Sequence, residues 1–247
     1  MKMYPMSLYE SGESNGTVSL KDLFDNLDNF DGCKSDLDID GIIYAICRGG
    51  WPSVFRIKSE KSRLNIAKDL FDQTVNKDIS NVDNVKRNPV WAETILRSYA
   101  RNMCTQADTK TIFADARATT GMSESTFFDY ISALEKLYII EDVDAWCPSI
   151  RSKTAIRASK KKNLIDPSIA VAALNLSPEY FNTDFKTLGF LFESLCFRDL
   201  KIYSSLQRGR MSYYHDRYGL EADAVLHLGN GKYAIIEIKL GSNEVDY

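Results

Sequence analysis

The hydrophobic pattern of the chain changes its period near residue 206, and this change limits the possible folds more than any other sequence feature. Apolar residues follow helical spacing from about Thr187 to Ser205. Three β-rich segments come after them: Met211 to Tyr214, Ala222 to Leu228 and Tyr233 to Leu240. Turn-forming residues separate these segments, first Arg217-Tyr218-Gly219 and then Gly229-Asn230-Gly231. The pattern predicts one long helix followed by three strands.

Acidic and basic residues occupy defined positions on these predicted elements. Glu237 and Lys239 are two residues apart on the last strand, so their side chains should leave the same face, with Ile238 on the other. The turn before that strand would bring Asp223, on the preceding strand, close to Glu237. Two carboxylates on adjacent strands form an oxygen-rich site that suits Mg²⁺. We therefore predict Asp223 and Glu237 as metal ligands.

Each member of this group has a role in metal-assisted cleavage of a phosphodiester. The metal would polarise the phosphodiester and activate a bound water, and Lys239 would orient that water or offset charge on the phosphorane. Glu193, on the preceding helix, would hold a second metal or a metal-bound water, and Arg198 would contact a phosphate. The alternative is a half-exposed strand with a favourable charge pair, because Glu-x-Lys alone is common. The element order favours the fold without establishing activity.

The middle of the chain has the pattern of a winged helix. Apolar residues recur at helical spacing from Pro89 to Cys104 and from Lys110 to Ala118. Ser123 is placed to cap a third helix, which runs from Glu124 to Lys136. β-Prone residues follow at Tyr138 to Ile140 and at Val143 to Trp146. Short helices joined by a turn and followed by a β-ribbon predict a winged-helix fold.

Short helices are also expected before this region. Gly41 to Cys47 and Ser62 to Thr74 have helical spacing, and a turn at Gly49-Gly50-Trp51-Pro52 joins them. The acidic run from Asp36 to Gly41 copies the first half of a calcium-binding loop. The last position of that loop, which requires a bidentate glutamate, is occupied by Cys47. We therefore expect an acidic helix start there and no calcium site.

A basic segment follows the predicted winged helix. It contains six basic residues and no acidic one: Arg151, Lys153, Arg157, Lys160, Lys161 and Lys162. Local clusters of this kind supply most non-specific affinity for DNA, so we predict these residues and Arg198 as nucleic-acid contacts. The third helix argues against DNA, because three of its four charged residues are acidic: Glu124, Asp129 and Glu135. The winged helix therefore either binds DNA or contacts another domain or protein.

Composition argues against several other classes of protein. The chain has 31 basic and 34 acidic side chains, so its formal charge of −3 leaves nucleic-acid binding to local patches. Five cysteines without a C-x-x-C pair argue against a disulfide framework or a zinc site and favour a reducing cytoplasm. The sequence has no leader-like amino terminus and no run of about 18 apolar residues. We expect a soluble, cytoplasmic protein.

Six short segments, taken together, carry a resemblance to a known family. They are Pro5-Met6-Ser7-Leu8-Tyr9-Glu10, Arg48-Gly49-Gly50-Trp51-Pro52, Asp166-Pro167-Ser168, Leu191-Phe192-Glu193, Glu221-Ala222-Asp223 and Ile236-Glu237-Ile238-Lys239. The chain resembles, over nearly all its length, bacterial and archaeal AAA-type ATPases. In these proteins the carboxy-terminal half joins a winged helix to a restriction-endonuclease-like domain, of the PD-(D/E)xK type, whose function is unknown. The resemblance implies an α+β or α/β architecture with a helical segment, a winged helix-turn-helix domain and an αβββ nuclease-like core.

The resemblance also implies a division of the chain into four parts. Residues 1–30 would be a remnant of the ATPase core edge, residues 31–88 a small lid-like helical unit, residues 89–163 the winged-helix domain and residues 164–247 the nuclease-like domain. In the family a P-loop precedes the segment that Pro5 to Glu10 resembles, and this sequence contains no P-loop motif. We expect a fragment that lacks the ATPase core, has no ATPase activity and binds ATP only as part of the parent protein.

Three functions are compatible with this sequence. The first is the carboxy-terminal region of an AAA-type ATP-binding protein whose winged-helix and nuclease-like domains bind, or also cleave, DNA with Mg²⁺. Its predicted catalytic residues are Glu193, Asp223, Glu237 and Lys239. The second is a catalytically silent interaction module that serves the missing ATPase domain through protein contacts. The third is DNA binding by the basic segment without chemistry.

Overall fold

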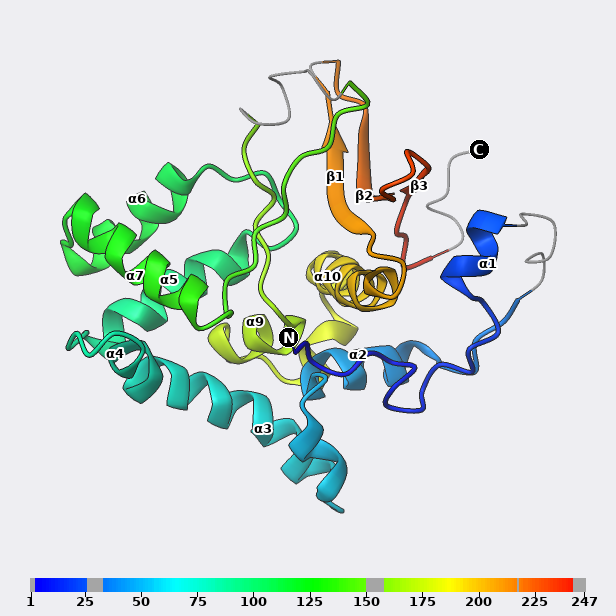
Figure 1. Ribbon diagram of the computed structural model, residues 1–247. Coiled ribbons are helices and arrows are strands. Elements are labelled where there is room, and N and C mark those ends of the chain that lie inside the picture. The colour runs from blue at the N-terminus through cyan, green and yellow to red at the C-terminus, as the bar shows by residue number, and fades with distance from the viewer. Residues whose placement is uncertain (1–2, 26–32, 150–157, 217, 242–247) are drawn as a thin grey trace.

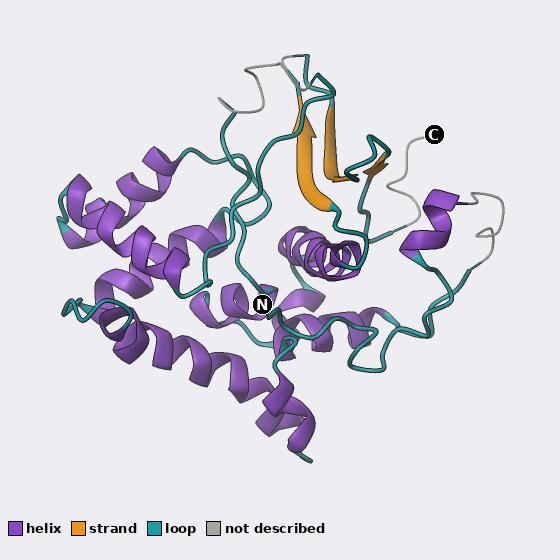
Figure 2. Ribbon diagram, in the orientation of Figure 1, coloured by secondary structure: helices purple, strands orange, loops and turns teal. Residues whose placement is uncertain are grey.

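The protein has a mixed α+β fold in which helices precede a small antiparallel sheet (Figures 1 and 2). The structure, a computed structural model, describes residues 3–25, 33–149, 158–216 and 218–241. The helices are α1 (Leu20–Asp25), α2 (Ile39–Arg48), α3 (Glu60–Gln73), α4 (Ile79–Asn81), α5 (Pro89–Arg101), α6 (Thr109–Thr120), α7 (Glu124–Lys136), α9 (Pro167–Ala173) and α10 (Phe185–Ser205). The strands are β1 (Arg210–His215), β2 (Glu221–His227) and β3 (Tyr233–Ile236). The predicted order of one long helix and three strands is therefore confirmed.

Shorter helical turns link several of these elements. Pro52–Arg56 and Pro178–Asn182 are 3₁₀ turns, and Thr74–Asp78 is a π-helical turn between α3 and α4. Among the described residues, no helix combines the length and the apolar character that crossing a membrane requires.

Polar side chains cap the first turn of two of these helices. Ser123 accepts a hydrogen bond from the Thr126 N–H at the start of α7. Asp38 accepts one from the Gly41 N–H, so the acidic run that imitates a calcium loop is the start of α2, as predicted. Caps of this kind satisfy backbone N–H groups that have no partner within the helix.

The three strands form a meander in the order β1-β2-β3, with both pairs antiparallel. Ala224 lies opposite Ile236, and a bulge between Ser212 and Tyr214 shifts the register of β1. The free edge of β1 pairs with the segment around Ala145, since the Trp146 N–H donates to the carbonyl of Tyr213 at 2.7 Å. The sheet is thus joined to the segment that follows α7.

Helix α10 packs across one face of this sheet (Figure 1). Phe197 of α10 lies in a hydrophobic cluster with Met211, Tyr213, Ala224 and Leu226. Ser212 and Val225, which lie between these residues on the strands, are buried as well, so the middle of β1 and β2 is covered on both faces. Because α10 is held in this way, side chains on it have fixed positions relative to β2.

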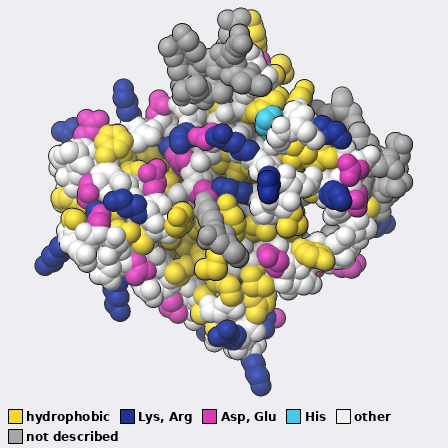
Figure 3. Space-filling view, in the orientation of Figure 1, with side chains coloured by type: hydrophobic (Ala, Val, Ile, Leu, Met, Phe, Trp, Pro, Cys, Tyr) yellow, Lys and Arg dark blue, Asp and Glu magenta, His cyan; other side chains and the backbone are white. Residues whose placement is uncertain are grey.

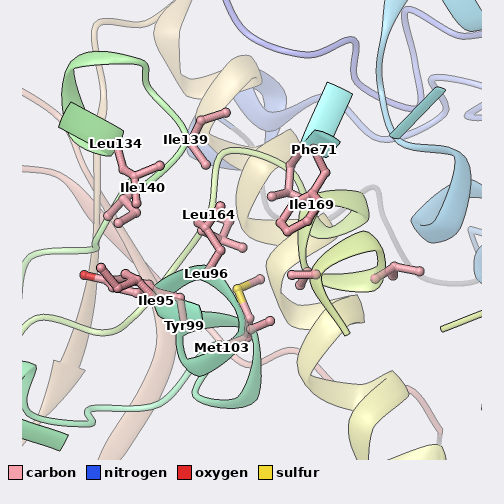
Figure 4. Packing of buried hydrophobic residues seen from close by; sticks show 14 of the residues in the cluster. Phe71, Ile95, Leu96, Tyr99, Met103, Leu134, Ile139, Ile140, Leu164 and Ile169 are labelled. Atoms are coloured by element: carbon pink, nitrogen blue, oxygen red, sulfur yellow. The ribbon is translucent and has the colours of Figure 1, made fainter. Parts of the chain in front are cut away.

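A second and larger hydrophobic core joins the helices (Figure 4). It contains Phe71 of α3, Leu96 of α5 and Leu134 of α7, together with Leu164 and Ile169. Leu195 of α10 belongs to the same core. This core therefore passes through the boundaries predicted at residues 88 and 163, and the helical segments on either side share buried contacts.

The region predicted to be a winged helix contains α6, a tight turn and α7. Gly121 ends α6 with a φ of 68°, a left-handed conformation that glycine adopts without strain. After α7, antiparallel bridges pair Ile140 with Leu164 and Val143 with Lys161. These paired segments follow α7 as a wing would, although element order alone does not establish a winged helix.

The last predicted strand is shorter than expected, and this corrects the placement of two predicted site residues. Strand β3 ends at Ile236 rather than Leu240, so Glu237 and Lys239 lie beyond it. The cause is a change of hydrogen-bond partner: the Ile238 N–H donates to the side chain of Asp223 at 2.7 Å rather than to the backbone of β2. The chain leaves the sheet at that point.

Arg87 connects the start of α5 to α7 through ion pairs between its buried side chain and two partly exposed carboxylates. Its guanidinium group lies 2.6 Å from Asp83 and 2.9 Å from Asp129 and donates to the carbonyl of Ile79. Asp129 is one of the acidic residues that made α7 a poor candidate for reading DNA, and its carboxylate is occupied by Arg87. Hydrogen bonds from Arg87 lower the pKa of Asp83 from its ordinary value of 3.8 to about 2.

This lowered pKa predicts a specific dependence of stability on pH. A depressed folded-state pKa gives a stabilising contribution that is complete above the unfolded value near 3.8 and is lost as the pH falls toward 2. Between these limits we expect wild-type stability to fall more steeply than that of Asp83→Asn, and above pH 4 we expect a constant difference. Urea unfolding followed by circular dichroism measures both curves. Parallel curves across the acidic range would contradict the prediction.

Candidate functional site

Three of the four predicted catalytic residues line one pocket of about 660 Å³. Glu193 comes from α10, Asp223 from β2 and Lys239 from the segment after β3. Packing of α10 on the sheet brings the first two elements together. Lys161, which the sequence placed in a nucleic-acid-binding segment, lines the same pocket.

Lys161 occupies the space between the two acidic residues. Its Nζ lies 2.6 Å from Oε1 of Glu193 and 3.2 Å from the backbone carbonyl oxygen of Asp223. Only 7% of Lys161 is exposed, and its ammonium group lies 5.5 Å from the centre of the Tyr213 ring. The pocket therefore already contains a cation supplied by the chain.

The backbone explains how Lys161 reaches this position. It exchanges two backbone hydrogen bonds with Val143, at 2.9 and 3.0 Å, so the strand-like segment is held alongside the residues after α7. Glu193 is 32 residues away in the sequence, and no pattern in the sequence links the two. Sequence reasoning therefore missed this role of Lys161.

Burial controls the ionisation of the groups around this ion pair. Burial raises the pKa of Glu193, while the ammonium of Lys161 opposes that rise. Burial also raises the pKa of the Cys104 thiol, next to the Glu193 carboxylate. The thiol is therefore protonated near neutral pH, and its arrangement does not suit a nucleophile.

The predicted metal ligands have other partners. One carboxylate oxygen of Asp223 accepts the hydrogen bond from Ile238, and Glu237 lies 2.7 Å from the ammonium of Lys239. Glu237 lines a different, largely apolar pocket of about 430 Å³ beside α10. Across residues 3–25, 33–149, 158–216 and 218–241, no three His, Cys, Asp or Glu side chains are grouped so that they could hold a metal ion. The structure thus does not bring Glu237 into the pocket that Asp223 lines, and a Mg²⁺ site on these two carboxylates stays a prediction.

The other residues predicted to contact nucleic acid differ in how exposed their side chains are. Arg151, Lys153 and Arg157 lie outside the described residues. Lys160 is 57% exposed and lies 3.2 Å from Asp144. Lys162 is buried and pairs with Asp142 at 2.6 Å. Figure 3 shows acidic and basic side chains interspersed over the face that it presents. Phosphate binding by Lys161 or Lys162 remains a prediction that requires these ion pairs to open.

Arg198 is also buried and contacts carboxylates of the chain. Its guanidinium lies 2.7 Å from Asp166 and 2.7 Å from Asp199, and 3% of its side chain is exposed. Asp199 in turn accepts a hydrogen bond from the Leu8 N–H at 2.8 Å. The predicted phosphate contact through Arg198 therefore remains a prediction that would require this buried group to change partners.

Asp166 extends this network to the turn after α2. Its carboxylate accepts hydrogen bonds from the Gly50 N–H at 3.0 Å and from the Ser168 N–H at 2.9 Å. The Met6 N–H donates to the carbonyl of Gly50, and a Cβ at position 50 would collide with the backbone of Met6. Three of the segments that carry the family resemblance therefore meet around the Asp166–Arg198 pair, where they stabilise the fold.

Replacing Arg198 with methionine should destabilise the protein strongly. The substitution leaves the Asp166 and Asp199 carboxylates buried without their cation, and breaking a buried pair in this way costs about 3–5 kcal/mol. Arg101→Met is the matched control, because Arg101 is 66% exposed and lies 3.7 Å from Asp115. An exposed pair of this kind contributes about 0–1 kcal/mol. Urea denaturation tests the difference, and equal losses for the two variants would contradict it.

Comparisons with known proteins give two family matches. Residues 188–246, which include Glu193, Asp223, Glu237 and Lys239, match a domain of unknown function, DUF4143, a domain found in AAA-ATPase-associated proteins. Residues 39–180, more than half of the chain, match a second domain of unknown function, DUF8612. No curated protein and no solved structure matches the chain. The chain therefore belongs to the family described as domain of unknown function DUF8612, with a DUF4143 match at its carboxy-terminal end.

Proposed function

We propose that this chain supplies a catalytically silent, nuclease-like recognition module to an AAA-type ATPase. The single observation that carries the proposal is the position of Lys161, whose ammonium bonds both to Glu193 and to the carbonyl of Asp223. The ammonium therefore stands beside the Glu193 carboxylate in the pocket where a nuclease would need a metal. The module would act through protein contacts.

The charges in the pocket support this proposal. A catalytic Mg²⁺ needs several oxygen ligands in near-octahedral geometry. Here the Glu193 carboxylate is directed to Lys161, one oxygen of Asp223 is directed to Ile238, and Glu237 is paired with Lys239. The ammonium of Lys161 balances the negative charge of Glu193. Unlike a metal ion, it has no coordination position that could bind a water or a phosphate. The arrangement stabilises the pocket without preparing it for catalysis.

The architecture supports the nuclease-like and winged-helix parts of the proposal. A long helix packed on a three-strand meander, with Glu193 on the helix and Asp223 on the middle strand, is the expected αβββ arrangement. Helices α5 to α7 and the paired segments after α7 have the order expected for a winged helix. The DUF4143 match supports association with an AAA-type ATPase, and ATP would be bound by that partner.

A Mg²⁺-dependent nuclease is the second candidate, because Glu193, Asp223 and Lys239 do line one pocket. This function requires Lys161 to leave the pocket when DNA and metal enter. Glu237 would also have to leave Lys239 and turn toward Asp223. The basic segment that contains Lys160 would then be positioned to contact DNA.

The two candidates differ in their response to Mn²⁺ and DNA. For the silent module we expect no saturable heat when Mn²⁺ is titrated into the protein in a calorimeter, and no cleavage of plasmid DNA with Mg²⁺ or Mn²⁺. Cleavage that is lost in both Asp223→Ala and Lys239→Ala would overturn our proposal and support the nuclease. Cleavage that both variants retain would identify a contaminating enzyme. Crosslinking in cells followed by mass spectrometry should recover a protein with an ATPase core.

Removing the cation from the pocket should have a large effect on stability. Lys161→Met leaves Glu193 buried without its partner, which costs about 3–5 kcal/mol at neutral pH. The loss should be smaller near pH 4.5, because burial raises the pKa of Glu193 and a proton can then replace the lost cation. Lys160→Met, at the exposed neighbouring position, should cost about 0–1 kcal/mol. Urea unfolding at both pH values tests this, and a loss independent of pH would contradict it.

A further inference from the structure

A second pocket, of about 540 Å³, lies on the other side of the segment that carries Lys160 and Lys161. None of the predicted catalytic residues lines it. Its lining residues include Trp146 from the segment after α7, Arg210 from β1, His227 from β2 and Tyr233 from β3. Its volume lies in the range of sites that enclose small organic ligands.

Two aromatic rings form one wall of this pocket. The ring centres of Trp146 and Tyr233 are 4.8 Å apart, and their planes are tilted by 45°. Tyr233 is 51% exposed, so part of its ring is accessible to a ligand. The Trp146 backbone is tied to the sheet by its hydrogen bond to Tyr213, which places the ring next to β1.

Two cations stand at the same pocket. Lys160 and Arg210 approach the two carboxylate oxygens of Asp144 at 3.2 and 2.8 Å. Their side chains are 57% and 72% exposed, so both remain open to solvent. One carboxylate balances only one of the two positive charges. The site therefore has a net positive charge, and Arg210 has N–H groups beyond the one that contacts Asp144.

We propose that this pocket binds a nucleotide unit, with the base on the Trp146–Tyr233 wall and the phosphate at Arg210 and Lys160. Aromatic rings next to a positively charged groove are the combination that binds single-stranded nucleic acid, because every base can stack and every nucleotide carries a phosphate. Acidic or purely apolar ligands would use only one half of the site. The unit is supplied either by a single strand or by a free nucleotide.

This inference does not depend on the proposed silent module. The pocket lined by Trp146, Arg210 and Tyr233, the aromatic pocket, is not lined by Glu193, Asp223 or Lys239. The pocket lined by these last three residues, the acidic pocket, contains none of the first three. Nucleotide binding would add a ligand to either candidate function. Failure of one proposal would leave the other in place.

The test uses the full chain and a fluorescein-labelled oligothymidylate of about ten nucleotides, a length that matches common single-strand sites. We expect saturable binding by fluorescence anisotropy, with affinity that falls as salt rises. Competition with unlabelled oligothymidylate, with thymidine monophosphate and with duplex DNA of equal length identifies the source of the ligand. Stronger competition by the strand than by the nucleotide indicates a single strand, and equal competition indicates a free nucleotide.

Two variants separate the two halves of the site. Tyr233→Leu keeps an apolar residue on β3 but removes a stacking ring, so it should weaken binding about five- to hundredfold with an unchanged salt slope. Arg210→Ala should weaken binding and also reduce the slope of log affinity against log salt by about 0.7, the contribution of one phosphate contact. Arg101→Ala, an arginine of similar exposure on α5, is the matched control and should change neither.

Three results would overturn the proposal. They are the absence of saturable binding, equal affinities for wild type, Tyr233→Leu and Arg210→Ala, and stronger competition by duplex DNA than by the single strand. Unfolded variants are recognised by circular dichroism. If Tyr233→Leu fails to fold, Tyr233→Phe replaces it and should retain wild-type binding, because the ring is kept, while Arg210→Ala remains weak.

Discussion

The buried ion pair between Arg198 and Asp166 is the interaction on which the arrangement of this protein depends. Through it, α10 is connected to the start of α9 and to the turn after α2, and Asp199 extends the connection to the amino-terminal segment. Helix α10 also packs on the sheet through Phe197 and forms one side of the pocket that Glu193 and Asp223 line. Packing on the sheet places Glu193 opposite Asp223, and the polar junction around Arg198 connects the same helix to the rest of the chain.

Local signals in the sequence predicted the local structure well. Ser123 caps α7 as expected, the acidic run from Asp36 to Gly41 contains the start of α2, and glycines of the last turn join β2 to β3. These features depend on neighbours only a few residues away. The segments that suggested an ATPase-associated family include residues that meet at the polar junction around Arg198. The presence of these residues in the family-like segments reflects how the segments pack around Arg198 as well as any chemical role.

The composition of the site was less predictable because it depends on distant contacts. Glu193, Asp223 and Lys239 do share a pocket, but Lys161 entered it from a segment that charge alone assigned to the surface. Glu237 was placed on a strand because the apolar alternation continues to Leu240. The side chain of Asp223 captures the Ile238 N–H and ends the pairing earlier. Sequence periodicity does not reveal that the Asp223 side chain accepts the hydrogen bond that a backbone carbonyl of β2 would otherwise accept.

The pairing of Lys161 with Val143 has a further consequence for this protein. Adjacent residues of an extended segment point in opposite directions, so Lys160 reaches the aromatic pocket while Lys161 reaches the acidic one. Because three lysines stand in a row, a slip of one residue that moved Lys161 and Lys162 into the places of Lys160 and Lys161 would still deliver an ammonium group to each pocket. Charge alone thus does not define the alignment of this segment. Two neighbours fix it: Leu164, which forms a bridge with Ile140 and lies in the hydrophobic core, and Lys162, whose side chain is buried against Asp142 at 2.6 Å. Together they determine which lysine serves which pocket.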